Sequence, residues 1–210
     1  MIQLLVIAKQ PVPGRVKTRL CPPCTPEQAA EVADASLSDT LRTIARTPAR
    51  RRVLVLDGAV PRPDGFTVVP QHGDGLAARL AHGFRDTALP DAPSLLIGMD
   101  TPQVTSDHLS QARDLLASAD AVLGMARDGG WWALGLRRPE HAELLRTVPM
   151  STPDTGRLTA EALRSGGLSV APLPVLRDVD DAVDAHAVAA ECPDGRFARA
   201  VARLVPGGVS

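Results

Sequence analysis

Aromatic residues are scarce in this chain of 210 residues: they make up 2% of it, and tyrosine is absent. Proteins that bind single-stranded nucleic acid stack the bases on aromatic side chains, so this class of function is not expected. The formal net charge is −1, which also argues against binding nucleic acid through bulk electrostatic attraction. A local cluster of cations can still bind one small polyanion.

Cysteine is also rare, with three residues in the chain. Cys21 and Cys24 enclose two prolines, but no second pair at matching spacing completes a zinc site. A redox pair should open a helix after a strand, whereas these prolines predict a loop. Free thiols are typical of a reducing cytoplasm, and neither a secretory signal nor a run long enough to span a bilayer is visible. We therefore expect a cytoplasmic protein that binds no membrane.

Short apolar runs alternate with segments of helical periodicity along the whole chain. Expected strands are residues 2–8, 53–56, 66–69, 94–99, 121–126, 131–136 and 169–175. Expected helices begin at Thr25, at residue 74 or 75 and at Thr105, cover 139–146 and 158–163, and end with two alanine-rich helices. This alternation predicts one α/β domain over residues 1–210, with a mainly parallel sheet covered on both faces.

Two helices carry specific expectations. Thr25 and Gln28 have the spacing of a capping box, with Pro26 in the first turn. The helix that starts near Asp74 is expected to bury Leu76, Leu80 and Phe84 on its inner face.

The first twenty residues carry the strongest local signal. A buried strand, Ile2–Ala8, is followed by two prolines and Gly14, which cannot continue a strand or a helix. Arg15, Lys17 and Arg19 follow directly. Backbone amides and cations that meet at the carboxyl end of a buried strand form a phosphate site.

Aspartates follow two later strands and are candidates for holding a metal ion. Asp100 comes directly after a buried strand, where a carboxylate can hold a divalent cation against a phosphate. The acidic turn with Asp178, Asp180 and Asp181 could supply a second carboxylate. Each feature alone is also compatible with an ordinary turn, and the sequence does not show whether the two turns meet.

Both tryptophans lie next to each other, after the turn Asp128-Gly129-Gly130. The glycines let a ligand approach the backbone, and an indole face can pack on a sugar-like surface. Because side chains alternate along a strand, only one of Trp131 and Trp132 should point inward.

Several reaction classes have no motif in this sequence. The Gly-x-Ser-x-Gly elbow of serine hydrolases is missing. The turn at Gly14 has Lys17-Thr18 but lacks the first glycine of a P-loop, and the dinucleotide fingerprint does not occur.

The motifs taken in order resemble a known family. They are Ala8-Lys9-x-Pro11-x-Pro13-Gly14-x-x-Lys17-Thr18-Arg19-Leu20, Gln71-x-Gly73-Asp74, Ile97-Gly98-x-Asp100-x-Pro102, Asp128-Gly129-Gly130-Trp131 and Asp178-Val179-Asp180. This series resembles the GT-A-like family named rSAM/selenodomain-associated transferase 1, or simply glycosyltransferase. That family is similar in outline to the 2-phospholactate and molybdenum-cofactor guanylyltransferases. The match runs from Ile2 to about Asp184.

The resemblance implies a three-layer, Rossmann-like GT-A domain that binds a nucleoside triphosphate or a nucleotide sugar with Mg²⁺ or Mn²⁺. The implied nucleotide-binding residues are Lys9, Gly14, Arg15, Lys17, Arg19, Gln71, Gly73 and Asp74, the last three near the base or ribose. The implied metal ligands are Asp100 and Asp180, with Asp178 as a third possibility, and Lys17, Arg19 and Asp100 would be catalytic. Asp128, Gly129, Gly130 and Trp131 would face the acceptor. The family usually has tyrosine at the position of Trp131, and it often has an aromatic residue that is missing before Ser151, so residues 150–153 receive no role.

The expected function is Mg²⁺-dependent nucleotidyl transfer from a triphosphate to a small phosphorylated acceptor. Glycosyl transfer from a nucleotide sugar is the alternative, and a nucleotide-binding module without catalysis is a third possibility. The sequence leaves the base, the acceptor and the oligomeric state open.

Overall fold

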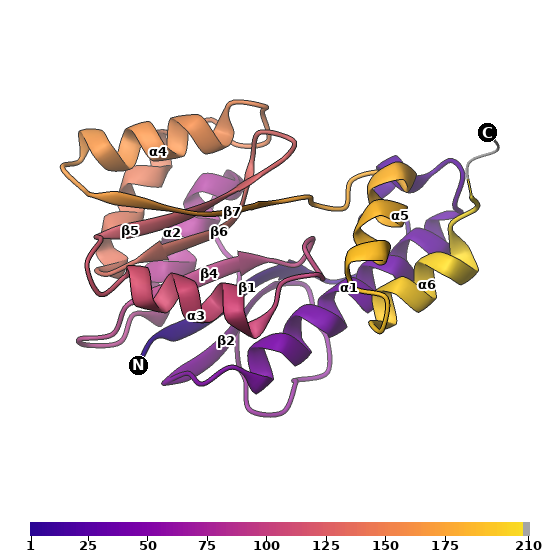
Figure 1. Ribbon diagram of the computed structural model, residues 1–210, viewed down its shortest axis with the longest axis horizontal. Coiled ribbons are helices and arrows are strands. Elements are labelled where there is room, and N and C mark those ends of the chain that lie inside the picture. Colours follow the sequence, from indigo (N-terminus) through magenta and orange to yellow (C-terminus); the bar gives the residue numbers. More distant parts are fainter. Residues whose placement is uncertain (208–210) are drawn as a thin grey trace.

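A run of aliphatic residues makes β1 (Gln3–Lys9) an interior strand of a seven-stranded sheet. In the computed structural model, which describes residues 1–207, the strand order is β3-β2-β1-β4-β6-β5-β7 (Figure 1). The other strands are β2 (Arg51–Asp57), β3 (Thr67–Pro70), β4 (Ser94–Gly98), β5 (Ala121–Ala126), β6 (Trp131–Leu136) and β7 (Val170–Leu176). Strand β6 runs antiparallel to β4 and β5, and the remaining neighbours pair in parallel.

This pairing brings six strands to end at one edge of the sheet. Strand β1 pairs with β2 on one side and with β4 on the other, so the order of the chain reverses there. Because β6 is antiparallel to both β4 and β5, these two strands run in the same direction, as does β7. We call this edge the carboxyl edge; open α/β sheets bind ligands at such an edge, near the reversal.

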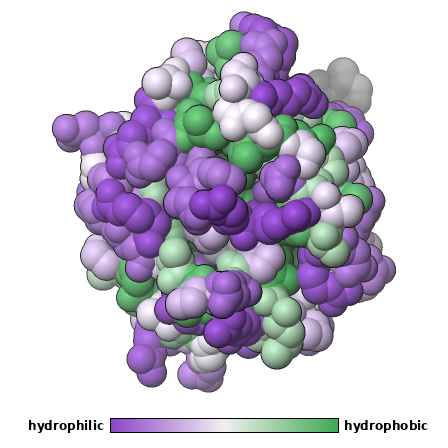
Figure 2. Space-filling model, turned by 90° about the vertical axis from the view of Figure 1, so that its left-hand side faces the viewer, coloured by the Kyte–Doolittle hydropathy of each residue, from purple (hydrophilic) through white to green (hydrophobic). Residues whose placement is uncertain are grey.

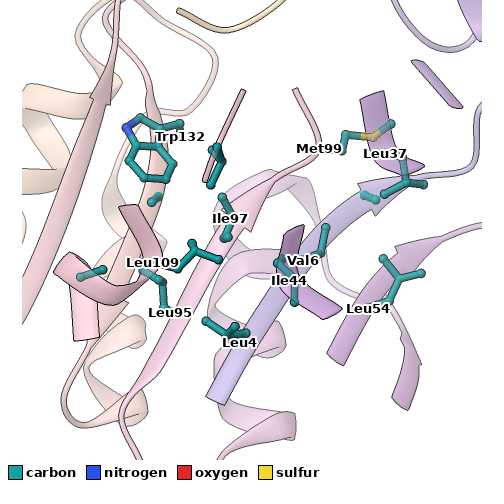
Figure 3. Packing of buried hydrophobic residues seen from close by; sticks show 14 of the residues in the cluster. Leu4, Val6, Leu37, Ile44, Leu54, Leu95, Ile97, Met99, Leu109 and Trp132 are labelled. Atoms are coloured by element: carbon teal, nitrogen blue, oxygen red, sulfur yellow. The ribbon is translucent and has the colours of Figure 1, made fainter. Parts of the chain in front are cut away.

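Helices cover both faces of the sheet and produce three layers. The helices are α1 (Pro26–Arg46), α2 (Gly75–Thr87), α3 (Ser106–Leu115), α4 (Thr155–Ser165), α5 (Ala182–Glu191) and α6 (Arg196–Leu204), with 3₁₀ segments η1 (Thr18–Leu20) and η2 (Pro139–Thr147). Leu37 and Ile44 of α1 and Leu109 of α3 pack on one face (Figure 3). Helices α2 and α4 and segment η2 pack on the other face. The predicted α/β architecture with a mainly parallel mixed sheet is confirmed.

The capping box at the start of α1 is present as predicted. The hydroxyl of Thr25 accepts a hydrogen bond from the Gln28 amide at 3.3 Å, and the Gln28 side chain accepts one from the Thr25 amide at 2.8 Å. These two bonds satisfy donors that an uncapped helix would leave without partners, and so they fix where α1 begins.

Two local expectations differ from the structure. The segment expected as a short helix at 139–146 is the 3₁₀ segment η2, whose buried residues Pro139, Ala142 and Leu145 recur every three positions. That spacing aligns side chains on one face at three residues per turn, which is the 3₁₀ period. The expectation that Leu76 is buried is wrong: it is 41% exposed, because it lies in the first turn of α2, at the carboxyl edge.

The two tryptophans point to opposite faces of the sheet, as alternation predicts. Trp132 is buried in the cluster beneath α1 and α3, and its indole nitrogen donates to the Pro174 carbonyl oxygen at 2.9 Å. Trp131 is partly buried against the cluster on the opposite face.

A third apolar cluster lies beyond the sheet, where α5 and α6 pack against the first turns of α1 (Figure 1). It also contains Leu20 from η1 and Val179 from the turn after β7, both fully buried. Buried Asp39 of α1 accepts a hydrogen bond from the Phe197 amide at 2.8 Å and so joins α1 to α6. The C-terminal helices therefore support the segments that flank the carboxyl edge.

The face of the molecule drawn in Figure 2 is mainly hydrophilic, with small hydrophobic areas between the polar side chains. Within residues 1–207, none of the helices has both the length and the apolar character needed to cross a membrane.

Candidate active site

Three aspartates stand at equivalent places along the carboxyl edge. Asp100, Asp128 and Asp178 each lie two residues beyond the last residue of a strand, namely β4, β5 and β7. Because these three strands run in the same direction, their following turns meet at one edge. The turns are also bonded together: the Val179 amide donates to the Asp100 carbonyl oxygen at 3.0 Å. The two acidic turns that the sequence left unconnected therefore lie side by side.

Carboxylates of Asp128, Asp178 and Asp180 form an acidic triad, whose ligand atoms lie within 4.8 Å of one another. Among residues 1–207, this is the one group of three or more His, Cys, Asp or Glu side chains close enough to share a metal ion. Burial, followed by the negative charge of Asp128 and then that of Asp180, raises the pKa of the Asp178 carboxyl to about 6. Burial and two neighbouring carboxylates thus make Asp178 harder to ionise than an ordinary aspartate.

Asp100 is a neighbour of the acidic triad and pairs with a lysine. Its carboxylate oxygen Oδ1 lies 2.5 Å from Nζ of Lys17. Asp128, which the resemblance implies at the acceptor side, lies beside Asp178 and Asp180, two of the implied metal ligands.

Lys17 and Arg19 extend from the loop after β1 to the acidic side of the site. Nζ of Lys17 also donates a hydrogen bond to the Val179 carbonyl oxygen, and Nη1 of Arg19 lies 2.7 Å from Oδ2 of Asp180. The Lys17 side chain is 8% exposed, whereas that of Arg19 is 75% exposed. Lys17 has a backbone φ of +49°, an uncommon conformation for a lysine. The fold thus holds the Lys17 ammonium group in place and leaves Arg19 largely in solvent.

The remaining predicted phosphate residues lie along the same loop with solvent around them. Lys9 is exposed at the end of β1, and Arg15 is exposed in the turn that follows. Gly14 is exposed with a φ of +73°, which glycine adopts without steric cost and which lets the chain turn back.

Gln71, Gly73 and Asp74 lie at the same edge, on the side of β2 and β3. Nε2 of the Gln71 side chain donates to the carbonyl oxygens of Ala8 in β1 and Val55 in β2, at 2.7 and 3.1 Å. These bonds connect the ends of the two strands. Gly73 has a φ of +113°, and Asp74 is exposed at the start of α2. Gln71 also lines a pocket of about 190 Å³ beside α2.

The turn with Asp128, Gly129 and Gly130 is held tightly by a segment that received no role from the sequence. Gly129 has a φ of +91°, and a Cβ atom there would lie 1.9 Å from the Pro153 carbonyl oxygen. The Gly156 amide donates to the Gly129 carbonyl oxygen at 2.8 Å. Asp128 in turn accepts a hydrogen bond from the Gly130 amide at 2.7 Å. Residues 150–156 therefore fix the position of the Asp128 carboxylate.

A second group of supporting residues, also missed from the sequence, holds the turn after β7. Nη1 of Arg177 donates to Asp184 at 2.7 Å, and the Asp180 amide donates to the same carboxylate at 3.4 Å. The buried side chain of Gln103 donates to the Arg177 carbonyl oxygen at 2.6 Å. Asp184 lies four residues after Asp180, which is a spacing that could have indicated this role.

Residues 30–152, more than half of the chain, match the model of a family described as an uncharacterized protein conserved in bacteria, DUF2064. The chain belongs to the DUF2064 family. The matched segment contains Asp100 and Asp128, and it does not reach Lys17 or Asp178. No curated protein sequence matches this DUF2064 protein.

Several solved structures share the fold of this DUF2064 protein. One of them is a protein of Desulfovibrio desulfuricans G20, named provisionally as a nucleotide-diphospho-sugar transferase. It is 23% identical to this chain, with a TM-score of 0.79, and the alignment covers 97% of this chain and 98% of that one. The Rv0371c protein of Mycobacterium tuberculosis H37Rv in complex with manganese is 23% identical, with a TM-score of 0.53 over 89% of this chain and 96% of that one.

A third similar structure is CMP:2-keto-3-deoxy-manno-octonic acid synthetase in complex with CTP. It is 10% identical, with a TM-score of 0.55 over 92% of this chain and 99% of that one. These likenesses confirm the nucleotide-diphospho-sugar transferase type of fold, in which transferases that use nucleotides occur.

Proposed function

We propose that this DUF2064 protein is a metal-dependent transferase that uses a nucleotide, and that its reaction is nucleotidyl transfer from a triphosphate to a small phosphorylated acceptor. One observation carries the proposal: the cations after β1 contact the acidic turns after β4 and β7 at the carboxyl edge. A triphosphate needs both kinds of partner, cations for its phosphate oxygens and carboxylates for the metal ion that accompanies it.

The donor set of the acidic triad fits a hard divalent cation. Three carboxylates within 4.8 Å provide the oxygen ligands that Mg²⁺ and Mn²⁺ prefer. Burial, and after it the charges of Asp128 and Asp180, raise the pKa of Asp178, and a bound cation would offset both by stabilising the ionised carboxylates. Asp128, Asp178 and Asp180 would hold the metal, and Asp100, which the resemblance implies as a ligand, would contribute from the neighbouring turn. When bound, a divalent cation neutralises phosphate charge and orients the group to be transferred.

The cations after β1 would bind the phosphates. Lys17 and Arg19 would contact the β- and γ-phosphates and stabilise the charge that develops on the leaving pyrophosphate. Arg15 and Lys9 would add attraction from solvent-exposed positions, and the turn at Gly14 would present backbone amides.

The other predicted residues would place the base and the acceptor. Gln71, Gly73 and Asp74 would lie near the base or ribose, next to the ends of β1 and β2. Asp128, Gly129, Gly130 and Trp131 would face the acceptor, whose phosphate oxygen would attack the α-phosphorus. Catalysis of this kind consists mostly of positioning and electrostatic stabilisation.

Glycosyl transfer is the second candidate, and the provisional name of the similar protein from Desulfovibrio desulfuricans supports it. In that reaction an acceptor hydroxyl would attack the sugar carbon, and a nucleoside diphosphate would leave. The buried position of Lys17 beside the acids favours the first candidate, because a cation held there suits a leaving pyrophosphate.

Isothermal titration of GTP, CTP, ATP, UTP and UDP-glucose, with and without Mg²⁺ or Mn²⁺, tests the proposal. We expect one triphosphate to bind tightly only with metal, and its identity gives the base. Preference for UDP-glucose would favour glycosyl transfer. Binding that needs no metal, without turnover of any nucleotide, would favour a module without catalysis. Absence of binding by all five ligands would contradict the nucleotide site.

A further inference from the structure

Lys17 is bound to the acidic half of the site and not directed toward solvent. Its ammonium group contacts the Asp100 carboxylate at 2.5 Å and donates to the Val179 carbonyl oxygen. These contacts use two of its three donors. The Leu20 amide donates to the Lys17 carbonyl oxygen at 2.9 Å, and this bond fixes the backbone of Lys17 at the start of η1.

The position of the ammonium group also affects the acidic triad. The Val179 carbonyl lies between Asp178 and Asp180 in the chain, so Lys17 is bonded to the turn that carries two members of the triad. The positive charge of Lys17 acts against the other influences on Asp178 and lowers the pKa of that carboxyl. The ammonium group is thus a cation already present where a metal ion would bind.

We propose that Lys17 is an internal counter-ion of the acidic site, which opposes the binding of a divalent cation until a polyphosphate ligand attracts its ammonium group away. This inference rests on the function proposed above. It states that each ligand strengthens the binding of the other. The polyphosphate attracts the Lys17 ammonium group away from the carboxylates, and a metal ion bound to the carboxylates displaces that group toward the polyphosphate.

Charge and geometry support this coupling. While the ammonium group contacts Asp100 and Val179, it has only one donor left for phosphate oxygens. A polyphosphate offers several negative charges, and Asp100 offers one, so the ammonium group has a stronger partner when such a ligand arrives. By thermodynamic linkage, the factor by which polyphosphate strengthens metal binding equals the factor by which metal strengthens polyphosphate binding. Arg19 pairs with Asp180 in a similar way, but solvent screens this exposed pair and makes its effect small.

The first test measures Mn²⁺ binding by electron paramagnetic resonance, with the full chain and without nucleotide, at about pH 8, where Asp178 is ionised. We expect Lys17→Met to bind Mn²⁺ about tenfold more tightly than the unmodified protein, which corresponds to about 1.4 kcal/mol. Lysine and methionine are both unbranched at Cβ, so the cost of the positive φ stays similar. Arg62→Met is the control: it removes one positive charge from an exposed position in the loop before β3, and its Mn²⁺ affinity should stay within about twofold.

The second test removes the other member of the pair and decides the matter if Lys17→Met does not fold. Asp100→Asn leaves Lys17 without its carboxylate partner, so metal-free binding of tripolyphosphate should become roughly fivefold tighter. The control is Asp64→Asn, which neutralises an exposed aspartate in the loop before β3 and should leave this affinity unchanged.

An unchanged Mn²⁺ affinity of Lys17→Met, or an unchanged tripolyphosphate affinity of Asp100→Asn, would overturn the proposal that Lys17 is a counter-ion. If Mn²⁺, tripolyphosphate and one nucleotide all bind the unmodified protein, such a result would leave the proposed function intact. If the unmodified protein binds none of the three, the counter-ion and the proposed function both fail.

Discussion

Replacing Asp178 with asparagine should stabilise the metal-free protein above about pH 6 and should remove its stabilisation by metal. The pKa of this carboxyl is raised in the folded protein from 3.8 to about 6. A carboxyl with a raised pKa binds more protons in the folded state than in the unfolded state. Folding stability therefore falls as the pH rises from about 4 to about 6, and the loss stays constant at higher pH. Asparagine carries no such charge and avoids the loss.

The size of this effect follows from the pKa. The pKa of Asp178 in the folded protein exceeds its ordinary value by about 2 units, and each unit corresponds to about 1.36 kcal/mol. The free energy of unfolding therefore changes by about 3 kcal/mol at most. Asp178 is partly exposed, and solvent reduces the repulsion that it feels. We therefore expect a gain of about 1–2 kcal/mol at about pH 8, or a rise in melting temperature of roughly 3–6 °C for a chain of this size.

Thermal unfolding at about pH 4 and about pH 8, with EDTA and with saturating Mn²⁺, measures the prediction. The gain from Asp178→Asn should be present at the higher pH and absent at the lower one. Saturating Mn²⁺ should stabilise the unmodified protein by about 2.7 kcal/mol at a hundredfold excess over its dissociation constant, and should not stabilise the variant. Asp64→Asn serves as a control without a pH-dependent effect. Equal gains at both pH values, or an undiminished response of Asp178→Asn to Mn²⁺, would refute the reasoning.

Three further substitutions test the supports of the site. Gly129→Ala should lower the free energy of unfolding by about 2–4 kcal/mol, because the added Cβ would meet the Pro153 carbonyl oxygen at a φ of +91°. Urea unfolding measures this loss, and a loss below about 0.5 kcal/mol would contradict the tight contact. Asp184→Asn should weaken Mn²⁺ binding about tenfold, because it loses the charge that Arg177 pairs with and loosens the turn after β7. An unchanged Mn²⁺ affinity in a folded variant would show that Asp184 does not position this turn. Asp39→Ala should destabilise the protein by about 1–3 kcal/mol, because the buried Phe197 amide at the start of α6 loses its acceptor. A chemical unfolding curve that matches that of the unmodified protein would show that α6 is held by other contacts.

Local chemistry was sufficient to predict most of the fold. Aliphatic runs such as Val53–Leu56 gave the positions of strands, because only buried strands tolerate them. Thr25 and Gln28 predicted the start of α1 because a capping box depends on residues within one turn. The 3₁₀ character of η2 differs from the short helix predicted over 139–146, and the period of three becomes visible only once the buried residues Pro139, Ala142 and Leu145 are known.

The contacts of the site depend on residues far apart in the chain and were less predictable. Lys17 and Val179 are separated by 162 residues, and periodicity carries no information about a bond between two loops. The place of Asp128 could have been inferred, because it follows β5 at the same distance as Asp100 follows β4. That inference needs the direction of β5, which is set by the antiparallel strand β6 between them.

The third apolar cluster has a consequence for the order in which the site can form during synthesis. Leu20 and Val179, which flank the Lys17 contacts, are buried in a cluster to which α5 and α6 contribute with the first turns of α1. A ribosome makes the cationic loop well before α6, and a domain completes its folding only when all the segments that pack in it have emerged. A nascent chain can therefore assemble much of its sheet before it can hold Lys17 against Val179. Ligand binding at this edge should appear only after residues 196–204 have emerged, so incomplete chains would not compete for nucleotide.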